Sequence, residues 1–144
     1  ATCVQPIDVK LPNVMVLNGL LPEDDMERIH EACHCYVSFS NSEGVGMGAV
    51  EAAVNNRPVI ITEYGAASEY IHTDYIIPCE RQELQEDDFL FKKGFTWGKP
   101  DFDHLMLFMR DCYQKNLKYV NHQWTRDITN EKVIKRQIKE LKTD

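Results

Sequence analysis

Two glutamates, Glu43 and Glu51, stand eight positions apart and flank a run of alternating glycines in the segment SNSEGVGMGAVEA, residues 40–52. The glycines let a ligand approach the backbone closely, and unpaired N–H groups at the start of a following helix attract an anion such as a phosphate. A carboxylate beside a phosphate is unfavourable unless it accepts hydrogen bonds from hydroxyl groups, which sugars supply. The segment therefore predicts a site for a phosphorylated, hydroxyl-bearing ligand. A tight turn with glycines used only for packing is the alternative.

The elements around this segment alternate between apolar strand patterns and helical patterns. Strands are expected over 13–19, 35–40, 57–64 and 74–79, and helices over 22–33, 47–56 and 67–71. Apolar strands separated by helices are typical of parallel βαβ units. The sequence therefore predicts an α/β fold, with a Rossmann-like parallel sheet of about four to five strands and ligands at the carboxyl ends of the strands.

The last third of the chain is predicted to be a helical tail over 101–144. A helix over 101–113 places Phe102, Leu105, Met109 and Cys112 on one face. A second helix over 129–142 has an apolar stripe and basic residues toward its C-terminal end, which the helix dipole favours. With 144 residues, the chain is long enough for one domain, 1–144, and not for two.

Composition excludes several classes of protein. The net charge of −7 argues against nucleic acid as a partner, and no apolar run approaches the roughly 20 residues that an integral membrane segment needs. Five cysteines without a CxxC pair indicate free thiols in a reducing compartment, so we expect a cytoplasmic protein. The histidines and cysteines do not have zinc-finger spacing, so no metal site is expected.

Two functional alternatives remain open from the residues themselves. The stretch GVGMGA, residues 44–49, matches the G-x-G-x-x-A form of the dinucleotide fingerprint, and Glu63 closes the next strand where a ribose-binding acid is expected. In that fingerprint the first glycine directly follows the strand, whereas residues 41–43 intervene here. An NAD-binding piece of an oxidoreductase is therefore one alternative function, and a non-catalytic α/β interaction domain is the other.

The segment VSFSNSEGVGMGAVEAAVNNRPVIITEYGAASEYI resembles the C-terminal, donor-binding domain of retaining GT-B glycosyltransferases of the family 4 type. Glu43 and Glu51 have the spacing of that family's E-x7-E motif. A Pro-Val-Ile strand at 58–60 follows, and then a turn of the family's Gly-Gly-x-x-Glu type at 65–69, with Ala66 where the family often has the second glycine. The resemblance covers residues 13–77 and implies the C-terminal half of a GT-B fold.

The resemblance also implies a role for each residue of the motif. Glu43 would be the catalytic residue that faces the donor sugar, and Glu51 would bind the ribose hydroxyls. The remaining donor-binding residues would be Gly44, Val45, Gly46, Met47, Tyr64, Gly65 and Ala66. The substrate would be a nucleotide-diphosphate sugar, transferred by a hexosyltransferase type of enzyme without a cofactor or a metal.

The same resemblance implies a partner. The family's acceptor-binding N-terminal domain has no counterpart here, so we expect it in the same polypeptide or in another chain, and the sequence to be truncated on its N-terminal side. The Arg and Lys that clamp the donor phosphates in the family have no match in residues 1–10, where Lys10 is the nearest candidate, and Arg57 is the cation closest in sequence to the glycines. The isolated chain is therefore expected to be inactive, and its acceptor is not indicated.

Overall fold

The computed structural model describes residues 9–88, 91–120 and 122, and it confirms the α/β fold. Its parallel sheet has the order β1–β2–β3, formed by β1 (Tyr36–Val37), β2 (Val59–Thr62) and β3 (Ile76–Ile77). Tyr36 pairs with Val59 on one side of β2, and Ile61 pairs with Ile76 on the other. Because β2 lies between two strands and two helical layers, all four of its residues are buried.

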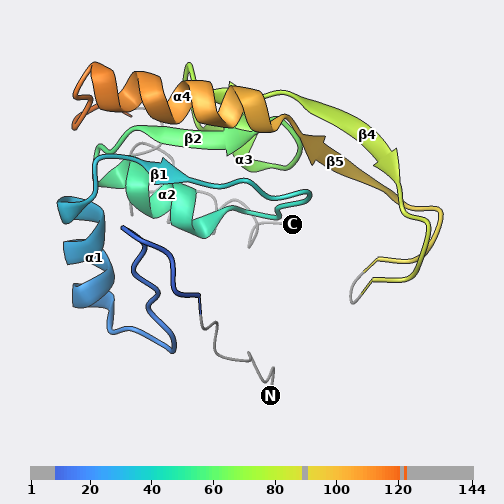
Figure 1. The fold of residues 1–144 in the computed structure, drawn as a ribbon, viewed down its shortest axis with the longest axis horizontal. Helices are drawn as coiled ribbons and strands as arrows, with labels where there is room; N and C mark the ends of the chain where they lie inside the picture. Colours follow the sequence, from blue (N-terminus) through green and yellow to red (C-terminus); the bar gives the residue numbers. More distant parts are fainter. Residues whose placement is uncertain (1–8, 89–90, 121, 123–144) are drawn as a thin grey trace, which may run out of the picture.

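Helices cover both faces of this sheet (Figure 1). On one face lies α2 (Met47–Val54), and on the other lies α4 (Phe102–Gln114). The side chains of β2 alternate between the two layers: Val59 and Ile61 pack with the alanines of α2, whereas Ile60 packs with Leu105 and Cys112 of α4. The short helix α3 (Ala67–Tyr70) adds Ala67 to the α2 side. Small alanines allow α2 to lie close to the sheet.

Helix α1 (Glu23–Ala32) packs against α2. It follows Pro22, and Glu23, Asp24 and Asp25 occupy its first turn, where negative charge stabilises the positive end of a helix. The buried residue of α1 is His30, and Cys33, which follows the helix, is exposed. The helix predicted over 22–33 is therefore present, with His30 on its inward side.

A two-stranded antiparallel ribbon projects from the body of the molecule (Figure 1). It consists of β4 (Cys79–Glu83) and β5 (Thr96–Pro100), paired from Cys79 with Pro100 to Glu83 with Thr96. The sequence does not predict this ribbon, because β4 is polar along nearly its whole length and lacks apolar alternation. The acidic stretch 83–88 beyond it is exposed except for Leu84, which is buried.

Three further expectations differ from the structure. Residues 13–19 form no strand, and Val14, Met15 and Leu17 are exposed, so the parallel sheet has three strands in the described residues. On α4, Met109 and Phe102 are also exposed, so only part of its predicted face is buried. The helix predicted over 129–142 lies outside the described residues. Within those residues, no helix is long and apolar enough to cross a membrane.

Candidate functional site

The glycine-rich loop connects the carboxyl end of β1 to the start of α2, as the sequence predicts. Gly46 precedes the helix with φ 69° and ψ 49°, a left-handed conformation that favours glycine, and its carbonyl accepts from the N–H groups of Ala49 and Val50. No side chain caps this end of α2. The first N–H groups of the helix are therefore available to an anion, and they carry the positive end of the helix dipole.

The loop is held closely against the turn that follows β2. At Gly65, where φ is +134°, a Cβ atom would lie 2.7 Å from the backbone oxygen of Glu43. At Gly46, a Cβ atom would lie 2.9 Å from Cβ of Ala67. Glycine is required at both positions because only a bare backbone allows this approach. The hollow left between loop and turn, lined by Glu43, Gly46, Tyr64 and Gly65 among others, is about 10 Å³.

A ligand must therefore bind on the outer side of the loop, because a hollow of this size holds about one water molecule. Gly44 is exposed there, and the side chains of Val45 and Met47 are 59% and 58% exposed. Ala66 is exposed in the adjacent turn. The structure thus brings loop and turn together at one edge of the sheet, the carboxyl ends of β1 and β2, where open α/β sheets bind ligands.

Two tyrosines show the negative potential around the two glutamates. Burial raises the pKa of the Tyr36 hydroxyl, and the charges of Glu43 and Glu51 raise it further. Burial and Glu43 act in the same way on the pKa of Tyr70, whose hydroxyl oxygen is buried and has no hydrogen-bond partner among the described residues. Tyr36 lies beside the first turn of α2, where a Cβ atom on Gly48 would approach its hydroxyl to 2.6 Å.

Glu51 lies further along α2 and faces a groove between α1 and α2 with a volume of about 490 Å³. Its carboxylate Oε2 is 3.5 Å from Nε2 of His30, and its side chain is 45% exposed. Sequence reasoning missed this contact, because His30 and Glu51 are 21 positions apart and no local pattern joins them. The available signal is that Glu51 has no partner at i+4, where Asn55 stands.

Strand β5 of the projecting ribbon is hydrogen-bonded to both the loop side and the turn side of the candidate site. The N–H of Gly98 donates to the carbonyl of Asn41 at 2.8 Å, and the Tyr64 hydroxyl donates to the carbonyl of Thr96 at 3.0 Å. Gly98 lies against Tyr64 so closely that a Cβ atom would come within 2.5 Å of Cβ of Tyr64. Tyr64 therefore serves as a contact for β5 in addition to being part of the turn.

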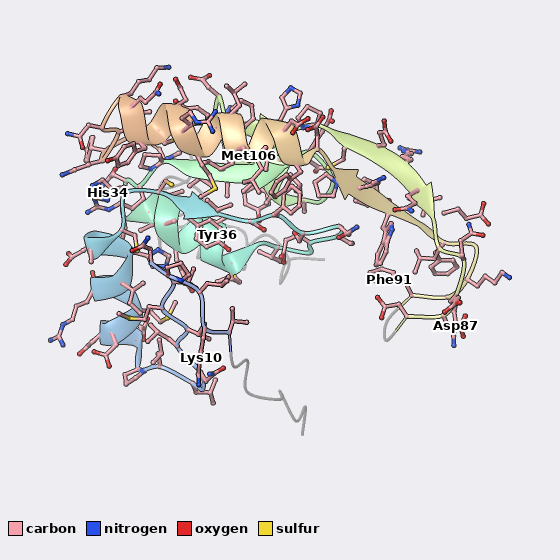
Figure 2. All side chains as sticks on the ribbon, viewed as in Figure 1. Lys10, His34, Tyr36, Asp87, Phe91 and Met106 are labelled. Atoms are coloured by element: carbon pink, nitrogen blue, oxygen red, sulfur yellow. The ribbon has the colours of Figure 1, made fainter. Side chains whose placement is uncertain are left out.

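The two candidate cations do not belong to this edge. Arg57 precedes β2 and donates from Nη1 to the carbonyl of Lys118, so it lies at the amino end of the strand, opposite the loop. Lys10 lies away from Tyr36, on the segment that precedes α1 (Figure 2). Arg57 is therefore close to the glycines in sequence but lies at the other end of the sheet. In the part of the chain that the structure describes, no group of three or more His, Cys, Asp or Glu could hold a metal ion.

The fold and this loop define a Rossmann-like domain with a candidate ligand site between strand ends and a helix start. A comparison with protein families matches the model described as glycosyl transferases group 1 to residues 8–88, more than half of the chain. The chain belongs to this family of glycosyltransferases, and its function is glycosyl transfer. The match does not favour the dinucleotide-binding alternative. A comparison with curated proteins finds no match.

Proposed function

We propose that this chain is the donor-binding domain of a retaining GT-B glycosyltransferase of the family 4 type, a hexosyltransferase that takes its sugar from a nucleotide diphosphate. The observation that supports this proposal is the uncapped start of α2 between two carboxylates eight residues apart, beside the tightly packed turn at Gly65. We further propose that residues 1–144 all belong to this donor-binding domain. The four cysteines in the described residues are unpaired, which is in keeping with a cytoplasmic protein.

In this proposal each residue of the E-x7-E motif has a separate task. Glu43 faces the sugar next to the reacting carbon, and Glu51 accepts hydrogen bonds from the ribose hydroxyls. The backbone from Gly44 to Met47 and the start of α2 stabilise the diphosphate as it leaves, which is electrostatic catalysis that needs no metal. Tyr64, Gly65 and Ala66 form the wall beside the donor.

We further propose that a second, acceptor-binding domain covers the exposed face of the loop during transfer. Val45 and Met47 are apolar side chains exposed at the edge of the candidate site, and transfer needs donor and acceptor held together in a defined geometry. This domain belongs to the same polypeptide or to another chain.

A binding panel tests the proposed function. The chain is mixed with UDP, GDP and ADP, their sugar conjugates and NAD, and binding is followed by thermal shift and by ligand-observed NMR. We expect the sugar conjugates of one of these three nucleotides to bind and to raise the melting temperature of the chain. Stabilisation by NAD alone would support the oxidoreductase hypothesis, and no response to any compound would favour an interaction domain.

A further inference from the structure

His30 is a buried histidine that faces the candidate ribose-binding glutamate from a neighbouring helix. It lies on α1, its side chain is 8% exposed, and its Nε2 atom is 3.5 Å from Oε2 of Glu51 on α2. Nε2 is buried and has no well-formed hydrogen bond to the described residues. The imidazole is therefore close enough to Glu51 for an ion pair when it is protonated.

Among the residues that the structure describes, those lining the groove around this pair include no other source of positive charge. Its lining residues include Met26, Val50 and Val54, with Glu23 and Glu27 from α1, and they include no lysine or arginine. From the β1 side, the ring of Tyr36 lies 6.2 Å from the ring of His30. Glu43 and Glu51 both act on Tyr36, whose pKa is raised, so Tyr36 keeps its proton near neutral pH.

A cation at this position would meet two physical needs of the candidate site. A carboxylate has two oxygens, so Oε2 of Glu51 can be held by the imidazole while Oε1 accepts from hydroxyl groups. A diphosphate near Glu43 and Glu51 experiences repulsion from both carboxylates, and a protonated imidazole beside Glu51 offsets part of it. Histidine is the side chain that gains this charge within the range of about pH 5 to 8.

We propose that His30 is a positioning residue for donor binding: it holds the Glu51 carboxylate in place for the ribose hydroxyls and makes donor affinity rise as the pH falls. This inference rests on the proposed function, in which Glu51 binds the ribose. His30 acts through Glu51 and does not itself contact the donor.

The first test measures donor affinity at two pH values with the sugar nucleotide from the panel that binds most tightly. A diphosphate esterified at both ends has no group that titrates near neutral pH, so the ligand itself stays unchanged. We expect the parent chain to bind about three- to tenfold more tightly at about pH 6 than at about pH 8, as one linked proton allows. A parent affinity that does not change with pH would overturn the proposal.

Variants of His30 separate positioning from simple packing. His30→Gln can still donate to Glu51 but cannot become charged, so it should bind like the parent at about pH 8 and lose the pH dependence. His30→Leu should bind about tenfold more weakly at about pH 8, and without pH dependence, because leucine has no polar group to hold the Glu51 carboxylate in place. His34→Gln is the matched control, since His34 is exposed outside this groove (Figure 2). A pH slope that persists in His30→Gln, or parent-like binding by His30→Leu, would contradict the inference.

A second test needs no ligand and therefore distinguishes failure of this inference from failure of the proposed function. Melting temperatures are measured for the parent, Glu51→Gln, His30→Gln and the double variant at about pH 6 and about pH 8. We expect Glu51→Gln to lower the melting temperature more at the lower pH, and this difference to vanish in the His30→Gln background. Absence of this coupling overturns the role of His30, whereas coupling without donor binding by the parent counts against the proposed function alone.

Discussion

At the scale of single residues, the contact between Gly48 and Tyr36 gives a direct test of how α2 is placed. A Cβ atom at position 48 would lie 2.6 Å from the Tyr36 hydroxyl and 3.0 Å from the ring. We predict that Gly48→Ala lowers the free energy of unfolding by about 1 to 3 kcal/mol, because the added methyl group overpacks this contact. Denaturant unfolding monitored by circular dichroism measures the change.

Two matched variants check that prediction. Tyr36→Phe removes the hydroxyl, so Gly48→Ala should cost less in that background. Gly44 has nothing within 4 Å of its Cβ position and no positive φ, so Gly44→Ala should leave stability nearly unchanged. An equal cost of Gly48→Ala with and without the hydroxyl would show that the hydroxyl contact is not the cause.

The two glutamates should have different effects when they are replaced. We predict that Glu51→Ala weakens sugar-nucleotide binding roughly 10- to 150-fold, since a charged acceptor of the ribose hydroxyls contributes about 1.5 to 3 kcal/mol. Glu43→Ala should mainly lower the turnover number in an enzyme that also has the acceptor-binding domain. Binding titrations and initial rates measure the two effects.

Glu31→Ala on helix α1 is the control, because Glu31 is an exposed glutamate that does not line the groove. Parent-like binding by Glu51→Ala would show that this residue does not hold the ribose.

The residue scale also shows what the sequence could predict about the site. The spacing of Glu43, the glycines and Glu51 correctly placed a loop between a strand and a helix, because each motif residue is near its partners in the chain. The contacts of Glu51 with His30 and of Tyr64 with Thr96 join segments that are 21 and 32 positions apart. No local pattern encodes such contacts, so sequence reasoning missed them.

At the scale of elements, α4 begins with a cap that can be tested through its pH dependence. The Asp101 side chain accepts from the backbone N–H of His104 at 3.0 Å. This hydrogen bond, followed by one from the His104 side chain, lowers the pKa of Asp101 in the folded state. A lowered folded pKa means that the stabilisation is complete above the unfolded pKa and is lost as the pH falls through the folded pKa.

We therefore predict that Asp101→Asn keeps the melting temperature near that of the parent at neutral pH, because asparagine also caps helices well. Below about pH 4 the variant should lose less stability than the parent, because the amide does not titrate. The pKa of Asp111 is also lowered, by Lys115 and Tyr75, so part of the acid sensitivity should remain in the variant. Thermal unfolding across the acid range measures both curves, and identical curves would contradict the role of the Asp101 charge.

The strands show why periodicity alone did not predict every element. Residues 13–19 have an apolar pattern that suggests a strand, yet β1 is bonded to β2 only, and no described strand pairs with its other edge. A strand needs a partner for its backbone groups, so an apolar pattern by itself does not make one. The ribbon is the reverse case: β4 and β5 satisfy each other's backbone, although their side chains are mostly polar and exposed.

At the scale of the whole molecule, the distribution of charge predicts weak binding by the chain as it stands. The net charge is −7, and Arg57 lies at the opposite end of β2 from the loop. With Arg57 at that end, a diphosphate at the loop would depend mainly on backbone dipoles among the described residues, and these supply less than a cationic clamp. We predict weak sugar-nucleotide binding and no measurable transfer by the isolated chain, with activity restored when an acceptor-binding domain is supplied.

A transferase assay with the panel of sugar nucleotides and simple sugar acceptors measures the rate of transfer by the chain. A longer glycosyltransferase of the same family serves as the positive control. Robust transfer by the 144-residue chain alone would show that it needs no second domain.

The hydrogen bonds between the ribbon and the candidate site make it possible to act on the site from a distance. Asn41, whose carbonyl accepts the hydrogen bond from Gly98, is two positions from Glu43, and Tyr64 belongs to the turn beside the loop. An antibody fragment that binds the far end of the ribbon would act on Asn41 and Tyr64 together, through their hydrogen bonds to β5. It would not cover the loop between β1 and α2. We expect such a binder to change sugar transfer without contacting the donor loop. It would recognise this protein by the ribbon, which is not part of that loop.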